Sequence, residues 1–273
     1  MLGLALSGVA MVTTLFHLLQ YREKLKEIDD LLYSKNGFEL TKKEWADVEK
    51  IIENNKNFDD LMHILQKYKH TKGIPFKAID LPNTTLLVGY DEYLNPITVD
   101  MLRTPHIGIM GLSNMGKSKC AECMLKNLKG AKITLVNAFR KDFSSINAKR
   151  INGLEEIKNF LQAELKDKSY RKIPHYIVID ECNVLSMETG IDKLIKGLLA
   201  QARHFNLYFI CILQLANKND CAYKNLFNTR ISFKHIDNDL IRVFVGSSPE
   251  NILRQQEFFM YSLDYYQGRT YNI

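Results

Sequence analysis

The sequence predicts an α/β fold in which a mostly parallel sheet is flanked by helices and preceded by a small helical region. Continuous apolar runs such as ITLV, YIVI and YFICIL are typical of strands that are buried on both faces of a parallel sheet. Amphipathic segments, with apolar residues three and four positions apart, alternate with these runs. Before Pro75 the chain shows only the helical pattern, so we expect the sheet to follow that point.

The alternation begins with two short apolar runs that are bounded by turns, TTLLVGY and NPITVD. After these runs, each expected strand is short and apolar, and each expected helix is amphipathic. We expect strands at 106–110, 132–137, 175–180, 207–213, 230–235, 258–262 and 269–273, and helices at 117–128, 154–167, 190–204 and 221–227.

Residues 21–75 are predicted to form a helical N-terminal region. Thr41 and Glu44 have the spacing of a capping box before the segment KKEWADVEKIIE. A further amphipathic segment runs near Phe58–Tyr68. The region carries no catalytic signature, so we expect a helical spacer or a small helical subdomain.

Residues 1–20 contain an apolar run, 2–19, that carries no formal charge. Eighteen helical residues would span ~27 Å, close to the ~30 Å of a hydrocarbon core. A signal peptide, a buried core helix and a single membrane anchor are the three interpretations. Arg22, Lys24 and Lys26 follow the run, so the positive-inside rule favours an anchor whose downstream chain lies on the inner face of the cell membrane, in the cytoplasm.

The charge of the chain is distributed unevenly. The formal net charge is +6. Residues 1–100 hold 12 basic and 15 acidic side chains, whereas residues 101–273 hold 25 basic and 16 acidic side chains. The basic excess of the second part permits a polyanionic partner. The five cysteines are scattered, and the one close pair, Cys120 and Cys123, lacks a second pair at the spacing of a zinc site.

The strongest motif is GLSNMGKS, which follows the apolar run HIGIM and precedes an expected helix. It matches the phosphate-binding pattern G-x-x-x-x-G-K-[ST], whose backbone N–H groups and helix N-terminus hold the phosphates of a nucleotide. Lys117 is expected to contact the β- and γ-phosphates of ATP, and Ser118 to coordinate Mg²⁺. The predicted binding residues are Gly111, Leu112, Ser113, Asn114, Met115, Gly116, Lys117, Ser118 and Lys119.

The second motif is HYIVIDE, an apolar strand that ends in Asp180 and Glu181. We expect Asp180 to bind Mg²⁺ and Glu181 to polarise the attacking water. A carboxylate directly after the Mg²⁺-binding acid favours hydrolysis over kinase-type transfer. Together with the alternating strands and helices, the two motifs predict a RecA-like P-loop ATPase core over residues 76–273.

Two further residues are candidates for the reaction. Gln214 ends the buried run YFICILQ, which is expected to lie beside the two-acid strand and to place the amide as a γ-phosphate sensor. Arg203, between these two strands, is a candidate to donate its charge to the nucleotide of a neighbouring subunit. A strand-end glutamine and a surface arginine are the structural alternatives.

Four ordered segments, over roughly residues 85–273, resemble the FtsK/SpoIIIE group of DNA-pumping ATPases within the FtsK–HerA class. They are LLVGYDEYLNPITVDMLRTPHIGIMGLSNMGKS, the two-acid strand, LIKGLLAQARHFNLYFICILQ and LFNTRISFK. The resemblance implies the roles given above, with Arg203 as the trans-acting arginine. It also implies a homo-hexameric ring that threads DNA.

The chain departs from that family at several positions. Asn114 stands where the family usually has glycine, although asparagine tolerates left-handed backbone. Leu215 and Ala216 replace an Arg-Pro pair after the sensor glutamine. These changes indicate a divergent branch. A compact motor with a single anchor resembles the plasmid, conjugative-element or phage members of the family more than the cell-division protein.

The sequence therefore predicts an ATP-hydrolysing, ring-forming DNA translocase in conjugative or plasmid DNA transfer, with a relaxase or another DNA-processing protein as a partner. Two alternatives remain open. One is a genome-packaging ATPase of a membrane-containing phage, and the other is a membrane-tethered ATP-binding switch or scaffold.

Overall fold

The computed structural model describes residues 19–20, 22–24, 26, 40–54, 57–139, 141–214 and 224–273 of the chain. The chain divides into two compact units, Met1–Ile74 and Pro75–Ile273. Within the described ranges, no helix has the length and apolar character that crossing a membrane requires. The anchor predicted at 2–19 lies outside these ranges except for Leu19.

The first unit contains helices α2 (Lys42–Glu53) and α3 (Phe58–Lys72). The predicted capping box is confirmed at the start of α2, where the backbone N–H of Thr41 donates to Glu44 Oε2 over 2.6 Å and Glu44 N–H donates to Thr41 Oγ1 over 3.3 Å. Val48 and Leu65 are fully buried. The two helices therefore share a small apolar core, as their amphipathic patterns predict.

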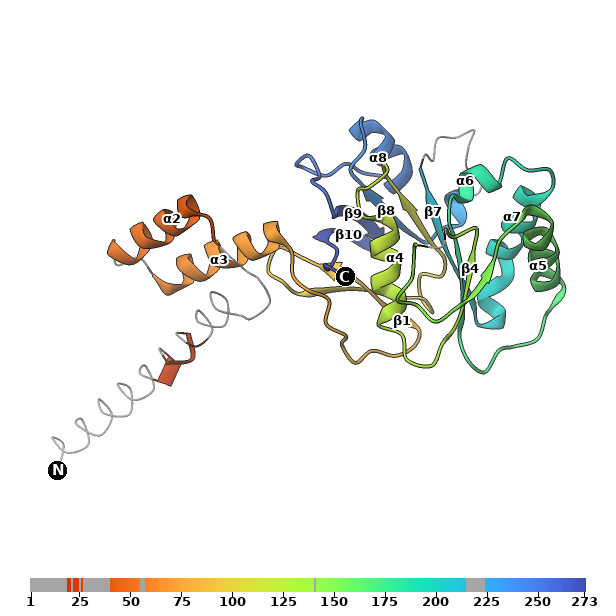
Figure 1. Ribbon diagram of the computed structural model, residues 1–273, viewed down its shortest axis with the longest axis horizontal. Helices are drawn as coiled ribbons and strands as arrows, with labels where there is room; N and C mark the ends of the chain where they lie inside the picture. The colour runs from red at the N-terminus through yellow and green to blue at the C-terminus, as the bar shows by residue number, and fades with distance from the viewer. Residues whose placement is uncertain are drawn as a thin grey trace, which may run out of the picture. The chain divides into compact units, whose positions relative to one another are not determined.

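The second unit is built on one ten-stranded sheet in the order β2-β1-β10-β9-β8-β3-β7-β6-β4-β5 (Figure 1). The six strands from β8 to β5 are parallel, and β9, β10, β1 and β2 extend the sheet with antiparallel pairs. The strands are β1 (Thr85–Tyr90), β2 (Pro96–Asp100), β3 (Ile107–Met110), β4 (Lys132–Val136), β5 (Lys149–Ile151), β6 (His175–Ile179), β7 (Leu207–Leu213), β8 (Thr229–Phe233), β9 (Glu257–Ser262) and β10 (Asp264–Arg269).

Helices cover both faces of the parallel strands. The helical elements are α4 (Lys117–Lys126), α5 (Leu154–Lys166), α6 (Cys182–Leu185), α7 (Ile191–Gln201), α8 (Asn238–Val245) and the 3-10 turns η1 (Ala202–Phe205) and η2 (Lys224–Leu226). Alternate residues of β6 enter opposite cores: Ile177 and Ile179 pack with α5, α7 and α8, whereas Tyr176 and Val178 pack with α4. This period of two, with every residue buried, is the physical reason for the continuous apolar runs in the sequence.

The predicted fold, a mostly parallel sheet flanked by helices, is confirmed. The strand expected at 269–273 is wrong: Leu263, at a φ of 66°, turns the chain directly from β9 into β10, which ends at Arg269. The helix expected at 221–227 is seen as the turn η2 in its described part. The short strand β5 and helix α8 were not expected. Three residues give β5 little periodic signal, whereas α8 is amphipathic and was missed.

Candidate nucleotide-binding site

The phosphate loop joins the carboxyl end of β3 to the first turn of α4. Gly111 and Gly116 have φ angles of 149° and 113°, which favour glycine. A Cβ on Gly111 would lie 2.7 Å from the Cβ of Phe233, so this position also needs the small residue for packing. Asn114 has a φ of 62°, which confirms that asparagine takes the left-handed backbone here. No side chain caps the N-terminus of α4, so its first N–H groups are available to an anion.

Lys117 begins α4 and is only 8% exposed. Its ammonium donates to the carbonyl oxygens of Gly111 over 2.7 Å and Leu112 over 2.9 Å, which fold the side chain over the loop. Burial lowers the pKa of Lys117, and the charges of Glu181 and Asp180 oppose that shift. The lysine charge and the two acids therefore interact across the end of the sheet, as the motifs predict.

The two acids lie directly after β6, at the same edge of the sheet as the phosphate loop. Burial raises the pKa of Asp180 to about 6. The backbone N–H of Glu181, which donates to Asp180 Oδ1 over 3.0 Å, and the charge of Lys117 oppose this shift, whereas the charges of Glu181 and Asp142 add to it. Glu181 has a left-handed φ of 50° and directly precedes the short helix α6. Strained backbone of this kind is typical of functional positions.

Gln214 lies beside these acids, because β7 pairs with β6 as the sequence predicts. Its amide donates to Glu181 Oε1 over 2.8 Å. Its backbone N–H donates to Oδ1 of Asn183 over 3.1 Å, and Asn183 is itself buried. The other Glu181 oxygen, Oε2, is buried and has no hydrogen-bond partner among the described residues.

Arg203 lies elsewhere. It belongs to η1, just before the amino end of β7, whereas the phosphate loop follows the carboxyl end of the parallel strand β3. Its charge contributes to the lowered pKa of His106, which stands just before the amino end of β3. The structure thus places Arg203 at the opposite edge of the sheet from its own phosphate loop, and its predicted action on a neighbouring subunit remains a prediction.

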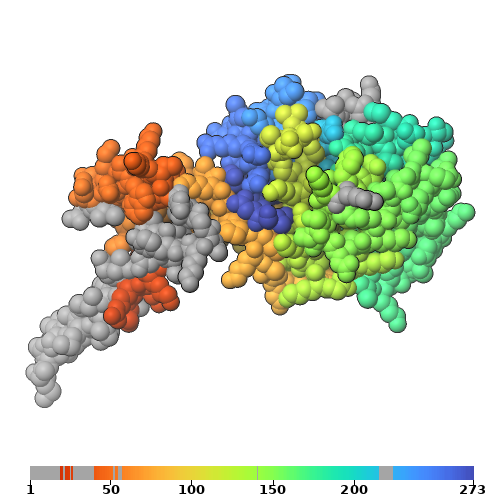
Figure 2. All heavy atoms as spheres, viewed as in Figure 1, coloured from red at the N-terminus to blue at the C-terminus, as the bar shows by residue number. Residues whose placement is uncertain are grey.

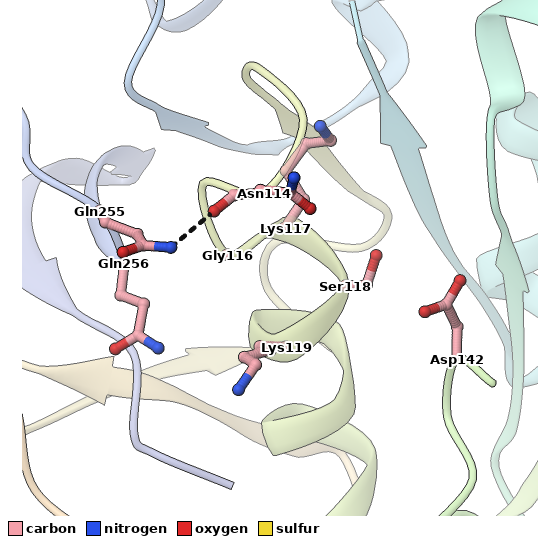
Figure 3. A pocket seen from close by; sticks show the side chains of 8 residues that line it. All are labelled: Asn114, Gly116, Lys117, Ser118, Lys119, Asp142, Gln255 and Gln256. Atoms are coloured by element: carbon pink, nitrogen blue, oxygen red, sulfur yellow. Dashed lines mark hydrogen bonds between the residues drawn. The ribbon is translucent and has the colours of Figure 1, made fainter.

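A cavity of about 520 Å³ opens at the phosphate loop (Figure 3). Besides loop and helix residues, it is lined by three residues that the sequence did not indicate: Asp142, Gln255 and Gln256. Figure 3 shows Asp142 facing the side of Ser118, while the two glutamines lie on the other side of the loop. Asp142 follows a strand, so the sequence could have indicated it as a site residue. Gln255 and Gln256 belong to no recognisable motif.

The donor set fits a magnesium ion. The Ser118 hydroxyl and the Asp180 carboxylate offer oxygen ligands, which Mg²⁺ prefers, and the described residues contain no group of three or more His, Cys, Asp or Glu side chains that could hold a metal ion by themselves. Glu181 Oε2 is buried and has no hydrogen-bond partner among the described residues, and burial raises the pKa of Asp180 although the charge of Lys117 opposes that shift. We therefore treat the pattern as compatible with a nucleotide and its metal.

No family model and no curated protein matches the chain, but solved structures do. The conjugation coupling protein TcpA of pCW3, with ATPγS, has a TM-score of 0.63 and 18% identity, with 73% of this chain and 70% of that chain covered. EccC of Thermomonospora curvata, with a signal-sequence peptide, has a TM-score of 0.56 and 15% identity, with 71% of this chain and 44% of that chain covered. EssC of Geobacillus thermodenitrificans has a TM-score of 0.59 and 12% identity, with 73% of this chain and 46% of that chain covered.

The chain spans less than half the length of the EccC and EssC chains, and about two thirds of TcpA. At these identities the likeness concerns the fold. The protein therefore has the fold of the FtsK/SpoIIIE-like P-loop ATPases, as the resemblance in its sequence predicted.

Proposed function

We propose that the protein is an ATP-hydrolysing motor that assembles as a homo-hexameric ring and moves DNA, in conjugative or plasmid DNA transfer. The observation that carries the proposal is the hydrogen bond from Gln214 to Glu181, 2.8 Å long, beside a phosphate loop whose lysine interacts with the same acids. A switch that only binds ATP requires the phosphate loop but does not require that the Glu181 carboxylate be held in one orientation.

The geometry described above supports the following proposed roles. The backbone of 111–116 and the N-terminus of α4 bind the phosphates, and Lys117 neutralises their charge. Ser118 and Asp180 hold Mg²⁺, which when bound supplies positive charge to the phosphate oxygens. Glu181 accepts a proton from the attacking water, and Gln214 fixes the orientation of its carboxylate.

A ring would explain why Arg203 lies far from the nucleotide site of its own subunit. Arg203 lies at the amino edge of the sheet, so it can reach a nucleotide only if another subunit presents its carboxyl edge to it. An arginine supplied by a neighbour stabilises the charge of phosphoryl transfer. Hydrolysis would then depend on assembly.

DNA is the proposed substrate for two reasons. The basic excess lies in residues 101–273, which contain the sheet from β3 onward, and contacts with phosphates need no base sequence. TcpA, which shares the fold, is described as a conjugation coupling protein. Attachment to the inner face of the membrane through residues 2–19 is part of the same proposal, with a relaxase as a partner.

The test is the rate of ATP hydrolysis by the full chain without DNA, with single-stranded DNA and with duplex DNA. Lys117→Ala and Glu181→Gln serve as controls. The proposal expects stimulation by one form of DNA, loss of hydrolysis in both variants, and weaker stimulation at higher salt. Hydrolysis that ignores DNA, or that responds to a peptide instead, would overturn the DNA assignment; ATP binding without turnover would favour the switch or scaffold.

A further inference from the structure

The nucleotide pocket has a second wall, which lies far from the phosphate loop in the sequence. Gln255 and Gln256 stand between α8 and β9, and both line the cavity. Figure 3 shows the side chain of Gln256 extending along the cavity on the side of Lys119, with Asp142 on the far side of α4. In Figure 2, the same arrangement appears as α4 between the blue C-terminal segment and the green segment after β4.

This wall is bonded directly to the phosphate loop. The backbone N–H of Gln256 donates to the carbonyl oxygen of Met115 over 2.9 Å, and the Gln255 side chain donates to that of Asn114 over 3.1 Å. A Cβ on Gly116 would lie 3.2 Å from Cα of Gln256. The two segments are therefore in close contact along the loop.

The position of Gln256 is fixed on its other side as well. Its carbonyl oxygen accepts from the backbone N–H of Thr270 over 3.0 Å, and its φ is 66°, in the left-handed region. Arg269, nearly buried, donates to Gln256 Oε1 over 3.5 Å. The amide oxygen thus faces Arg269, which leaves the amide N–H groups to the cavity.

The direction of a bound nucleotide follows from the order of the strands. The acids and Gln214 follow β6 and β7, on one side of β3, whereas Gln256 precedes β9, on the other side. A terminal phosphate that reaches the acids leaves the rest of the nucleotide to extend toward β8 and β9. Gln256 is then the side chain next to the nucleoside half.

We infer that Gln256 is a specificity-determining residue whose amide donates a hydrogen bond to the nucleoside half of the bound nucleotide. The inference rests on the proposed function and adds to it a contact outside the phosphate loop. The cavity lining, as far as the chain is described, contains no aromatic side chain on which a base could stack.

The test compares two ligands that the enzyme does not hydrolyse. Mg²⁺ complexes of ADP and of inorganic pyrophosphate share the diphosphate, and pyrophosphate has an ionisable oxygen in place of the nucleoside; their dissociation constants are measured by calorimetry on the full chain. Gln256→Gly removes the amide and accepts the left-handed backbone without strain. Gln256→Asn keeps an amide that is one methylene shorter, and Gln267→Ala removes an exposed amide of β10 outside the cavity.

We expect Gln256→Gly to weaken ADP binding by about tenfold, the effect of one hydrogen bond of about 1.4 kcal/mol, and to change pyrophosphate binding by less than about twofold. Gln256→Asn should lose ADP affinity with an unchanged melting temperature, and Gln267→Ala should behave as the wild type.

Equal weakening of both ligands would mean that Gln256 only supports the loop, and it would overturn the inference, as would no change in either. A wild-type protein that binds pyrophosphate as tightly as ADP would overturn the inference but leave the phosphate site. A wild-type protein that binds neither ligand would instead overturn the proposed function.

Discussion

The side-chain amide of Gln214 donates to Oε1 of Glu181 over 2.8 Å, although the two residues end different strands. The bond occupies one carboxylate oxygen and leaves the buried Oε2 as the acceptor that has no partner among the described residues. The hydrogen bond from Gln214 thereby fixes the position of one carboxylate oxygen of Glu181.

Substitutions at these two positions should affect turnover more than binding. We expect Glu181→Gln to lower kcat by about a hundredfold or more, since general bases contribute at least that much. Gln214→Ala should lower kcat by about tenfold, or about 1.4 kcal/mol, with KM nearly unchanged. Steady-state hydrolysis measures both, with Gln201→Ala, which lies at the end of α7, as the control. A rise in KM alone would show that Gln214 does not orient the acid.

Gly116 should tolerate alanine less well than Gly190. Both have positive φ angles, 113° and 87°, so each alanine costs about 1 kcal/mol in backbone strain. A Cβ at Gly116 also meets Gln256 and the Phe233 ring at 3.2 Å, whereas nothing lies within 4 Å of one at Gly190. We expect the free energy of unfolding, measured with urea, to fall by about 2–3 kcal/mol for Gly116→Ala and by about 1 kcal/mol for Gly190→Ala. Equal losses would contradict the close contact of the loop and its second wall.

Asp180→Asn should make the metal-free protein more stable at alkaline pH. Burial raises the pKa of Asp180 from 3.8 to about 6, so between these values the folded state binds more protons than the unfolded state. Stability therefore falls as pH rises through this window, by at most about 3 kcal/mol above pH 6. We expect Asp180→Asn to remove this loss, with about 2 kcal/mol gained at pH 8 in EDTA and nothing gained at pH 4. Urea titrations at both pH values measure it; destabilisation at pH 8 would contradict it.

Acid should destabilise the fold through two buried histidines. Burial lowers the pKa of His106 and of His175 from 6.5 to about 3, so both are neutral when folded. The two neutral histidines contribute their full stability to the folded state above pH 6.5. This contribution is lost as pH falls from 6.5 toward 3, by about 1.4 kcal/mol per pH unit for each histidine. The control is His106→Asn, which accepts the φ of 65° and can replace the ring Nδ1 as acceptor for Phe209 N–H. Its stability should vary less steeply with pH than that of the wild type.

Mixed subunits should reveal whether Arg203 acts in trans. Arg203→Ala and Glu181→Gln subunits should each be inactive alone, because one lacks the arginine and the other lacks the acid. When they are mixed, a site with an intact acid can receive the arginine of its neighbour, so hydrolysis should recover in part. Rates measured at several mixing ratios test this. No recovery in a mixture that assembles would show that Arg203 does not serve a neighbouring site.

The parts of the fold that the sequence predicted are those with a strong local pattern. The runs that form β3, β4, β6 and β7 are buried on both faces, so each stands out as apolar, and the loop motif follows from local backbone geometry. The hairpin of β9 and β10 was missed because β10 is exposed over four of its six residues. Its turn depends on the left-handed Leu263, for which leucine gives no signal.

The candidate site divides in the same way. Lys117, Ser118, Asp180 and Glu181 belong to motifs that are continuous in sequence, and Gln214 ends a recognisable strand. Gln256 reaches the cavity only because β9 pairs with β8 and brings the preceding residues beside the loop. Such a contact depends on tertiary pairing, which one sequence without periodicity at that point does not reveal.

The pairing of β1 with β10 has a consequence for synthesis of the protein. Tyr90 faces Arg269 across this pair, and Pro75 forms a bridge with Asn272. On the ribosome, β1 and β2 emerge long before β10, and the loop strand β3 cannot be joined to them through a complete sheet until β8, β9 and β10 have followed. Folding that depends on such distant pairs is slow. The nucleotide pocket, including Gln256, is therefore complete only after β9 has been synthesised and has paired with β8.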